Sequence, residues 1–223
     1  MSDFAGKTVV VTGAGGALGS GLATAFTAAG ATVIGVDRAA PDERALVSGV
    51  RYETADLGDD SQVAALFGAI DAPWAVVHTV GGFAPHVPLT QLDPEVLDRQ
   101  LALNLCTAAV VTKHALRVMR AVGSGRIVHT SSRAATTTTG SGFAYSVSKL
   151  GVLHLVAMAA DEIRGTGITI NTVVPSIIDT PANRAAMPDA DHDSWPKIHA
   201  IAHTYLFLAS PKAGLVNGSA LAV

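Results

Sequence analysis

The sequence predicts an α/β protein, a doubly wound sheet of seven parallel strands with helices on both faces. Short apolar runs alternate with helical segments along all 223 residues, and no linker rich in Pro, Gly or Ser interrupts them. The run at residues 7–11 indicates a strand buried on both faces, and the alternation is typical of a parallel sheet that helices cover on both sides. The same continuity predicts a single domain over residues 1–223. The expected strands span residues 7–11, 31–36, 50–53, 75–79, 126–130, 169–174 and 219–223.

A glycine-rich turn follows the first strand and precedes an apolar-periodic segment at residues 18–28. Strand, turn and helix in this order are the context of a dinucleotide-binding turn, although a tight turn without a ligand is the alternative. Residues without side chains let a pyrophosphate approach the backbone, and the following helix terminus attracts it. We therefore expect a dinucleotide phosphate here. The candidate residues are Gly13, Gly15, Gly16, Ala17, Leu18 and Gly19.

The second strand ends in Asp37, 18 residues after Gly19. That is close to the spacing at which an acid binds the adenosine ribose of a dinucleotide. A carboxylate accepts hydrogen bonds from both ribose hydroxyls but repels a 2′-phosphate, so Asp37 favours NAD(H) over NADP(H). Arg38 works against this preference, because its guanidinium could bind a phosphate if the side chain turned inward.

Helix starts are marked along the next third of the chain. Between the second and third strands only residues 41–48 remain, so a helix there should be short. Residues 59–61 precede the run VAALF, and Asp93 followed by Pro94 is a helix cap with proline in the first turn. We expect a helix to begin at each of these two places.

Tyr145 and Lys149 lie four residues apart in a segment expected to be helical over residues 143–164. This spacing places a phenol and an ammonium on one helix face. The ammonium should favour the phenolate and lower the pKa of the tyrosine, which makes the pair an acid/base couple. Solvated neighbours on a surface helix are the alternative, and the glycine turn is what favours the chemical interpretation.

Composition excludes several other classes of protein. With 49% hydrophobic and 15% charged residues the chain can bury a large core. A net charge of −3 without a basic cluster argues against nucleic acid and anionic membranes as partners. No apolar run reaches the ~18 residues that a membrane span needs. The single Cys106 cannot form an internal disulfide, so we expect a cytoplasmic protein with Cys106 in its core.

Several motifs together resemble the short-chain dehydrogenase/reductase family. TGAGGALG at residues 12–19 is similar to the family's TGxxxGxG, and YSVSK at residues 145–149 to its YxxxK. The resemblance implies a Rossmann fold and an NAD(P)-dependent oxidoreductase that acts on small alcohols or carbonyls. It also implies a homodimer or homotetramer, which agrees with the excess of apolar residues on the helix at 143–164 and on the one after Asp93.

The resemblance implies roles for individual residues. Tyr145 would be the general acid/base, Ser132 would orient the substrate oxygen, Lys149 would bind the nicotinamide ribose, and Asn104 would support a proton path to Lys149. Asp56 and Leu57 would contact the adenine, Gly81 would line the cofactor site, and Thr180 would anchor the carboxamide. The implied cofactor segment at residues 175–180 includes Pro175, Ile178 and Thr180.

The chain departs from the family pattern in three places. Ala17 replaces a glycine of the turn, Ser176 replaces the glycine of PGxxxT, and HTVGGF at residues 78–83 replaces the usual NNAG. The GALGS segment and the glycine pair before Phe83 are similar to dihydropteridine reductases, so an NADH-dependent quinonoid dihydropteridine reductase is the alternative function. A catalytically silent NAD(H) sensor is an alternative of another class.

The substrate side gives weaker signals. Residues 181–195 have Pro and Asp but no periodicity, which favours a lid over the site. The residues that flank the motifs and could line a substrate pocket are Phe83, Pro85, His86, Arg133, Phe143, Ile177, Asn183, Met187 and Trp195.

Histidines could suggest other chemistry. His199 and His203 have the spacing of two zinc ligands, but a third ligand at a defined spacing is missing, so we expect exposed histidines and no metal. His78 and His129 fall in strands, where hydrogen-bonded interior residues are expected. The chain has no GxSxG elbow, which disfavours a serine hydrolase.

Overall fold

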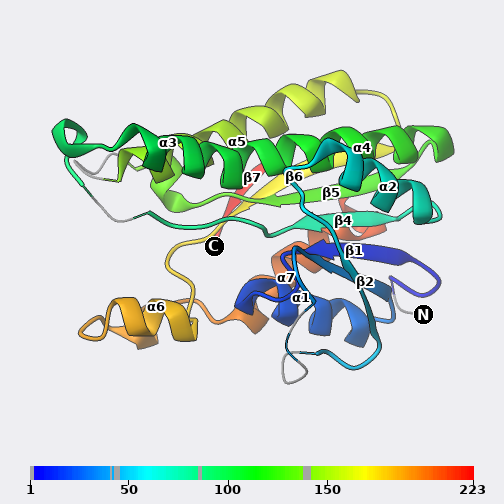
Figure 1. The fold of residues 1–223 in the computed structure, drawn as a ribbon. Coiled ribbons are helices and arrows are strands. Elements are labelled where there is room, and N and C mark those ends of the chain that lie inside the picture. The colour runs from blue at the N-terminus through cyan, green and yellow to red at the C-terminus, as the bar shows by residue number, and fades with distance from the viewer. Residues whose placement is uncertain (1–2, 41, 43–45, 85–86, 138–141) are drawn as a thin grey trace.

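The computed structural model describes residues 3–40, 42, 46–84, 87–137 and 142–223. Its centre is a sheet of seven parallel strands in the order β3-β2-β1-β4-β5-β6-β7 (Figure 1). The order reverses between β1 and β4, and in such sheets ligands bind at the carboxyl ends of the strands near the reversal. The fold class is therefore as predicted.

All seven predicted strands are confirmed, with ends that differ by at most one residue. Most residues of β1, β2, β4, β5 and β6 are buried, whereas the two edge strands are not: β3 is half-buried or exposed, and β7 is short and largely exposed. The strands are β1 Thr8–Thr12, β2 Thr32–Asp37, β3 Val50–Thr54, β4 Ala75–His78, β5 Gly125–Thr130, β6 Ile168–Val174 and β7 Ala220–Ala222.

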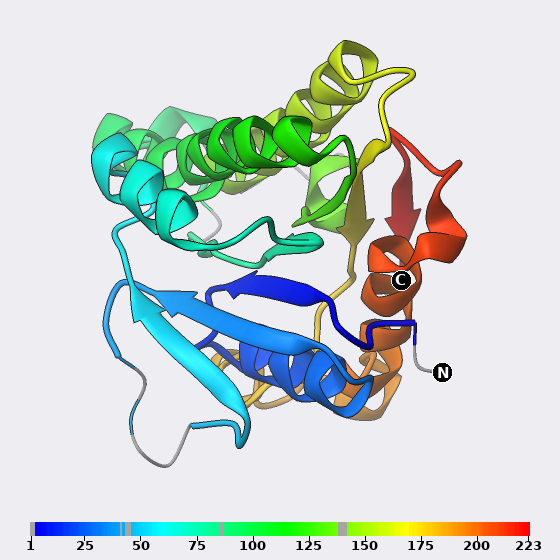
Figure 2. The same ribbon diagram turned by 90° about the vertical axis from the view of Figure 1, so that its right-hand side faces the viewer.

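Helices cover both faces of the sheet (Figures 1 and 2). One layer contains α2 Asp60–Ala69, α3 Pro94–Gln100, α4 Thr107–Val122 and α5 Phe143–Glu162, and the other contains α1 Ala17–Ala28 and α7 Ile198–Ala209. Two buried clusters fill the spaces between sheet and helices: Val10, Ile127 and Ile170 face the first layer, and Val11, Val128 and Val173 face the second.

The predicted helix starts are confirmed at both caps. The Asp59 carboxylate accepts from the N–H groups of Ser61 and Gln62 at the start of α2, and the Asp93 carboxylate accepts from the Glu95 N–H at the start of α3. Each cap satisfies N–H groups that have no partner inside the helix. The expected helix at 41–48 falls partly on residues 41 and 43–45, outside the described residues, and residues 42 and 46–48 are not helical.

Two features differ from the expected pattern. A π-helical segment, η3 Leu101–Cys106, joins α3 to α4 and carries Asn104. Residues 181–195 are not a plain loop, since they contain α6 Pro181–Ala186 and the 3₁₀ turn η5 His192–Ser194. Figure 1 shows α6 beyond the carboxyl ends of the strands, across from α3. Shorter 3₁₀ turns are η2 Leu89–Gln91, η4 Arg133–Ala135 and η6 Pro211–Ala213.

Helix α5 corrects one expectation about membranes. Within the described ranges it is one helix whose length of 20 residues and apolar composition would suffice to cross a membrane. The sequence shows no uninterrupted apolar run here, because Lys149, Gly151 and His154 lie among the apolar residues. The signal is weak, because a core helix passes the same test. Here Val152, Val156 and Ala160 of α5 are buried in the protein.

Candidate active site

The predicted site residues gather at the carboxyl edge of the sheet. The glycine turn follows β1, Asp37 ends β2, Asp56 follows β3, and Gly81 follows β4. Ser132 follows β5 and the segment 175–180 follows β6, while η3 and α5 bring Asn104, Tyr145 and Lys149. The parallel sheet thus brings together residues that are far apart in the sequence.

The glycine turn is packed too closely for side chains at two positions. A Cβ on Gly19 would lie 2.0 Å from the Gly13 carbonyl oxygen, so the helix can approach the turn only with glycine there. Gly13 has a φ of +72°, which favours glycine. Helix α1 starts without a side-chain cap and without an acidic residue in its first turn. The N–H groups at this helix end can therefore bind an anion.

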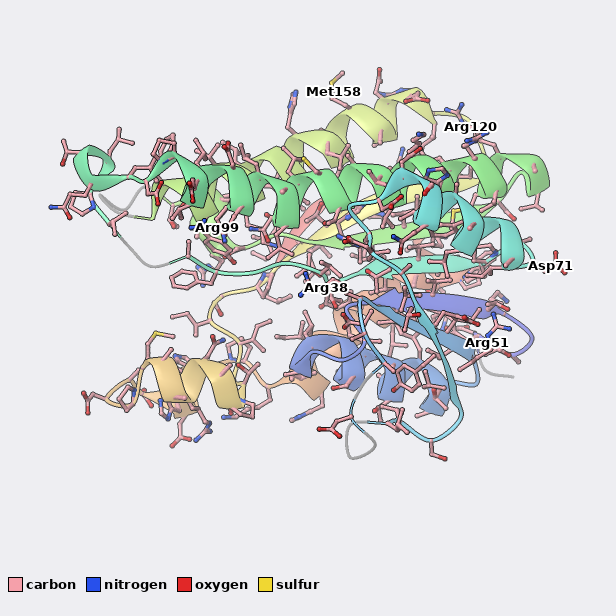
Figure 3. The ribbon with its side chains drawn as sticks, viewed as in Figure 1. Arg38, Arg51, Asp71, Arg99, Arg120 and Met158 are labelled. Carbon is pink, nitrogen blue, oxygen red and sulfur yellow. The ribbon has the colours of Figure 1, made fainter. Side chains whose placement is uncertain are left out.

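Asp37 reaches back to this turn. Its carboxylate accepts hydrogen bonds from the Gly15 N–H at 3.0 Å and from the Arg38 N–H at 2.7 Å. The acid expected to bind a ribose therefore also fixes the glycine turn, because it ties the turn to the end of β2. The Arg38 side chain is exposed (Figure 3).

The two residues implied to contact adenine have different surroundings. Leu57 is buried in the core, with 5% of its surface exposed, whereas Asp56 is exposed and accepts a hydrogen bond from the Gly58 N–H. Only Asp56 therefore offers its side chain at the surface of the site. Ala17 begins α1 and is exposed, so its methyl group lies outside the close contact between Gly13 and Gly19.

Asn104 is a buried hub between three segments. Its side-chain oxygen accepts from the Gly82 N–H at 2.9 Å, and its amide donates to the Gly82 carbonyl, to Gln100 Oε1 and to Ser148 Oγ. A Cβ on Gly81 would lie 2.6 Å from Asn104 Oδ1 and 2.8 Å from Lys149 Nζ. Glycine at position 81 therefore allows the backbone to pack closely against both Asn104 and Lys149.

The hydroxyl groups of Ser132 and Tyr145 are hydrogen-bonded to each other. Ser132 caps η4, where its oxygen accepts from the Ala134 N–H at 3.2 Å, and this contact fixes the serine. The ring of Phe83 packs edge-on against that of Tyr145, with centroids 5.2 Å apart. Tyr145 is thus oriented from two sides.

The pKa of Tyr145 differs from the expectation. Burial raises it above the usual 10.0, and the hydrogen bond with Ser132 lowers it by less. The expected lowering by Lys149 is not seen, because the lysine has a different partner: its ammonium donates to the Thr130 carbonyl at 3.1 Å. Burial also lowers the pKa of Lys149 from 10.5 to about 8. Both side chains are therefore held by the segment 130–132: Lys149 by the Thr130 carbonyl and Tyr145 by the Ser132 side chain.

Two residues behind Lys149 gave no signal in the sequence. Thr130 provides the carbonyl that holds the ammonium, and its hydroxyl is hydrogen-bonded to the Tyr205 hydroxyl of α7 at 2.7 Å. Tyr205 is fully buried. No short sequence motif could reveal this contact, because Thr130 and Tyr205 are 75 positions apart in the sequence. They come together because α7 packs against the sheet.

The segment after β6 joins the site to the region of α6. The Pro175 carbonyl accepts from the Arg133 N–H at 3.0 Å, which links this segment to the serine loop. Thr180 caps α6, where its hydroxyl oxygen accepts from the Asn183 N–H at 3.1 Å. Ser176 donates its N–H to the Val223 carbonyl, so the serine that replaces a glycine is accommodated without a positive φ.

Comparison with known proteins identifies this arrangement. The profile described as short chain dehydrogenase matches residues 7–191. The chain belongs to the short-chain dehydrogenase family. It is therefore an oxidoreductase of alcohol and carbonyl substrates, in a family that uses nicotinamide cofactors.

Relatives of this short-chain dehydrogenase align along nearly its whole length. A cis-4-hydroxycyclohexanecarboxylate dehydrogenase of Sinomonas cyclohexanicum is 33% identical, over 99% of this chain and 96% of the relative. A D-threitol dehydrogenase of Mycolicibacterium smegmatis is 29% identical, over 98% and 91%. The solved structure of a short-chain dehydrogenase/reductase from Mycobacterium ulcerans has a TM-score of 0.90 at 32% identity, over 99% and 89%.

The residues expected to line a substrate pocket differ in their exposure. Phe83, Arg133, Phe143 and Ile177 are exposed. Trp195 is instead 8% exposed and stacks on His192, so it does not offer an open surface. The side chains of Asn183 and Met187 are half-buried in the α6 region. Pro85 and His86 lie outside the described residues.

The buried histidines of the dehydrogenase are interior residues, as predicted. The hydroxyls of Thr12 and Thr107 are hydrogen-bonded to the two ring nitrogens of His78. The Thr112 hydroxyl is hydrogen-bonded to Nε2 of His129 at 2.8 Å. His199 and His203 are exposed, and the described part of the chain contains no group of three metal-ligating side chains. The expectation for Cys106 was wrong, because it is exposed on η3.

Proposed function

We propose that the protein is an NAD(H)-dependent oxidoreductase that transfers hydride between nicotinamide and a small alcohol or carbonyl compound, with Tyr145 as general acid/base. One observation carries the proposal. The Tyr145 hydroxyl is hydrogen-bonded to Ser132 beside the buried Lys149, at the sheet edge where the glycine turn lies. A proton donor and a second hydrogen-bond donor therefore converge on one place.

The residues fit a dinucleotide. The uncapped, acid-free start of α1 suits a pyrophosphate, and Gly81 packs closely against Asn104 and Lys149 at the same edge of the sheet. Asp37 would hold the adenosine ribose, which favours NAD(H) over NADP(H), while Lys149 and Thr180 would hold the nicotinamide end. Bound nicotinamide supplies the hydride, and the protein supplies position and protons.

In the proposed mechanism, negative charge grows on the substrate oxygen as a carbonyl is reduced. Tyr145 donates its proton to that oxygen, and Ser132 donates a second hydrogen bond. The raised pKa of Tyr145 keeps the phenol protonated at neutral pH, which suits reduction. Asn104 holds η3 against the Gly82 backbone and so keeps the floor of the site in place.

The proposed substrate is a small cyclic compound that bears a carboxylate. The ring of Phe83 packs against that of Tyr145, and Phe83 and Phe143 both expose apolar surface. Arg133 directly follows Ser132, and its guanidinium has no partner among the residues the structure describes. A relative acting on a hydroxycyclohexanecarboxylate agrees with both features. The edge-on packing of Phe83 also fits a flat pterin ring, so the dihydropteridine reductase activity stays the alternative.

The test is NADH oxidation with 4-oxocyclohexanecarboxylate, its methyl ester, cyclohexanone and quinonoid dihydropterin. We expect turnover of the cyclic ketones, with the carboxylate preferred to its ester. Turnover of the pterin alone would establish the alternative. Tight NADH binding without turnover of any compound would instead establish the NAD(H) sensor, and tighter binding of NADPH than NADH would refute the role of Asp37.

We further propose that residues 1–223 work as one domain in a cytoplasmic homodimer or homotetramer. Large apolar side chains are exposed on the outer layer: Leu150 and Met158 of α5, Leu103 of η3 and Val122 of α4 (Met158, Figure 3). Such side chains favour burial against a second subunit. Sedimentation of a stable monomer at micromolar concentration would overturn the oligomer.

A further inference from the structure

The carboxylate of Asp179 joins two cations from different parts of the chain. It accepts from both Arg184 Nε and Arg184 Nη2, the latter at 2.9 Å, and from Lys197 Nζ at 2.6 Å. The side chain of Asp179 is 12% exposed, while those of Arg184 and Lys197 are 46% and 38% exposed. Two-pronged binding by arginine is the strong form of this contact, and the low exposure of the carboxylate reduces screening by solvent.

These contacts close a loop. Lys197 is 18 residues after Asp179 and immediately precedes α7. The Asp179 N–H also donates to the Pro196 carbonyl at 3.1 Å, and Lys197 Nζ donates to the His192 carbonyl at 3.3 Å. The two ends of residues 179–197, which we call the substrate lobe, are thus fastened together at one point.

The substrate lobe has little core of its own. Trp195 is its one buried residue, and the remainder are half-buried or exposed. Its other internal contacts are local: Thr180 caps α6, and the His192 ring is hydrogen-bonded to the Met187 carbonyl at 2.7 Å. Because packing is sparse, the position of the lobe depends on the ionic contacts of Asp179.

We propose that Asp179 is a positioning residue that fixes the substrate lobe beyond the carboxyl edge of the sheet and holds the adjacent Thr180. The proposal rests on the proposed function. A lobe held by these contacts would present a preformed substrate wall. Among the described residues, Ser132, Tyr145 and Lys149 have no hydrogen bond to the lobe. Loosening the lobe should therefore weaken substrate binding more than the chemical step.

The test compares Asp179→Asn with a matched control, Asp161→Asn. The control removes an ion pair with Arg164 on the exposed end of α5, where both side chains are more than two-thirds exposed, at 79% and 73%. For Asp179→Asn we expect KM for the carbonyl substrate to rise about tenfold, since each factor of ten is about 1.4 kcal/mol and a charged hydrogen bond contributes more than that. The kcat should change less than about twofold, and the control should match the wild type.

Two further measurements separate positioning from general destabilisation. In a Lys197→Met background, Asp179→Asn should raise KM by less than in the wild type, because one of its partners is already gone. Trypsin should cut after Arg184 or Lys197 faster in Asp179→Asn than in Asp161→Asn. Cleavage by trypsin does not depend on enzyme activity. It therefore measures how firmly the lobe is held even if the protein does not catalyse the proposed reaction.

A fall in kcat at unchanged KM would overturn the proposal, as would equal KM and cleavage in Asp179→Asn and Asp161→Asn. If Asp179→Asn does not fold, Arg184→Gln carries the same comparison, because it leaves the pair between Asp179 and Lys197 intact. For that variant we expect a smaller rise in KM and faster cleavage after Lys197.

Discussion

Two groups of residues lie at the same edge of the sheet but are held by different forces. One is the proposed catalytic set Asn104, Ser132, Tyr145 and Lys149, which we call the quartet, and the other is the substrate lobe. In the quartet, Asn104 and Lys149 are buried and bound to backbone atoms of neighbouring segments, Gly82 and Thr130. In the lobe, Asp179 holds partly exposed cations. Salt and solvent screen the second kind of contact much more than the first. A change in salt concentration should therefore alter substrate affinity more than the rate of the chemical step.

The largest expected effect tests the chemical half of this comparison. Tyr145→Phe removes the proton donor but keeps the ring that packs against Phe83. We expect kcat to fall about a thousandfold, within the range of general acid catalysis, with NADH affinity changed less than about twofold. Stopped-flow turnover and fluorescence titration measure the two quantities. Tyr52→Phe, on β3, is the control, and an equal loss of binding and turnover would contradict a purely chemical role.

Ser132→Ala should have a smaller effect on the same step. One of the two donors to the substrate oxygen remains, so we expect kcat to fall about a hundredfold. The control is Ser146→Ala on α5, whose hydroxyl has no hydrogen bond among the described residues. A rise in KM at unchanged kcat would contradict this prediction. Ser132 would then affect substrate binding, as the lobe is expected to do, and the two regions would not differ in role.

The pH profile sharpens the comparison for Lys149. Burial lowers its pKa to about 8, so the ammonium loses its proton as the pH rises through that value. We expect kcat/KM for NADH, which reports the free enzyme, to fall above about pH 8. In Lys149→Arg the fall should move to higher pH, because arginine stays charged. In Lys113→Arg, on the exposed side of α4, the profile should match the wild type.

A smaller effect concerns stability beneath the quartet. Burial, and then the charge of Lys149, lower the pKa of His129 from 6.5 to about 3. The unfolded chain binds more protons between these values, so the contribution is complete above pH 6.5 and is lost as the pH falls toward 3. At pH 5 the loss amounts to about 2 kcal/mol.

Guanidinium unfolding of the wild type and of His129→Leu at pH 7.5 and pH 5 measures this loss. The leucine variant should lose less stability between the two values than the wild type. His203→Gln, exposed on α7, should lose as much as the wild type. An equal loss in all three proteins would show that the buried imidazole is not the source.

The sequence allowed the fold to be predicted because parallel strands such as β5 and β6 are buried along their whole length. Apolar and β-branched residues are frequent in β6 and occur in β5, whereas β7 is short and exposed. The glycine turn and the pair Tyr145 and Lys149 were found because each is local in sequence. Their placement at one edge follows from the parallel sheet.

What could not be predicted depends on distant contacts. The pKa of Tyr145 is set by burial, and the partner of Lys149 is a carbonyl on β5 that is 19 residues away. The lobe was expected to be a loop because ionic contacts between Asp179, Arg184 and Lys197 leave no periodicity. The exposure of Cys106 depends on the π-helical turn, which shifts the face that η3 presents to the core.

The hydrogen bond between Asp37 and Gly15 has a consequence for attempts to change cofactor choice. Exchanging the acid for a small neutral residue is the obvious way to admit a 2′-phosphate. Here the same exchange would also remove the acceptor that ties the glycine turn to β2. Engineering for NADPH should therefore begin with a residue that still accepts from the Gly15 N–H, such as serine, combined with the existing Arg38. A bare alanine would give an enzyme that binds both dinucleotides poorly.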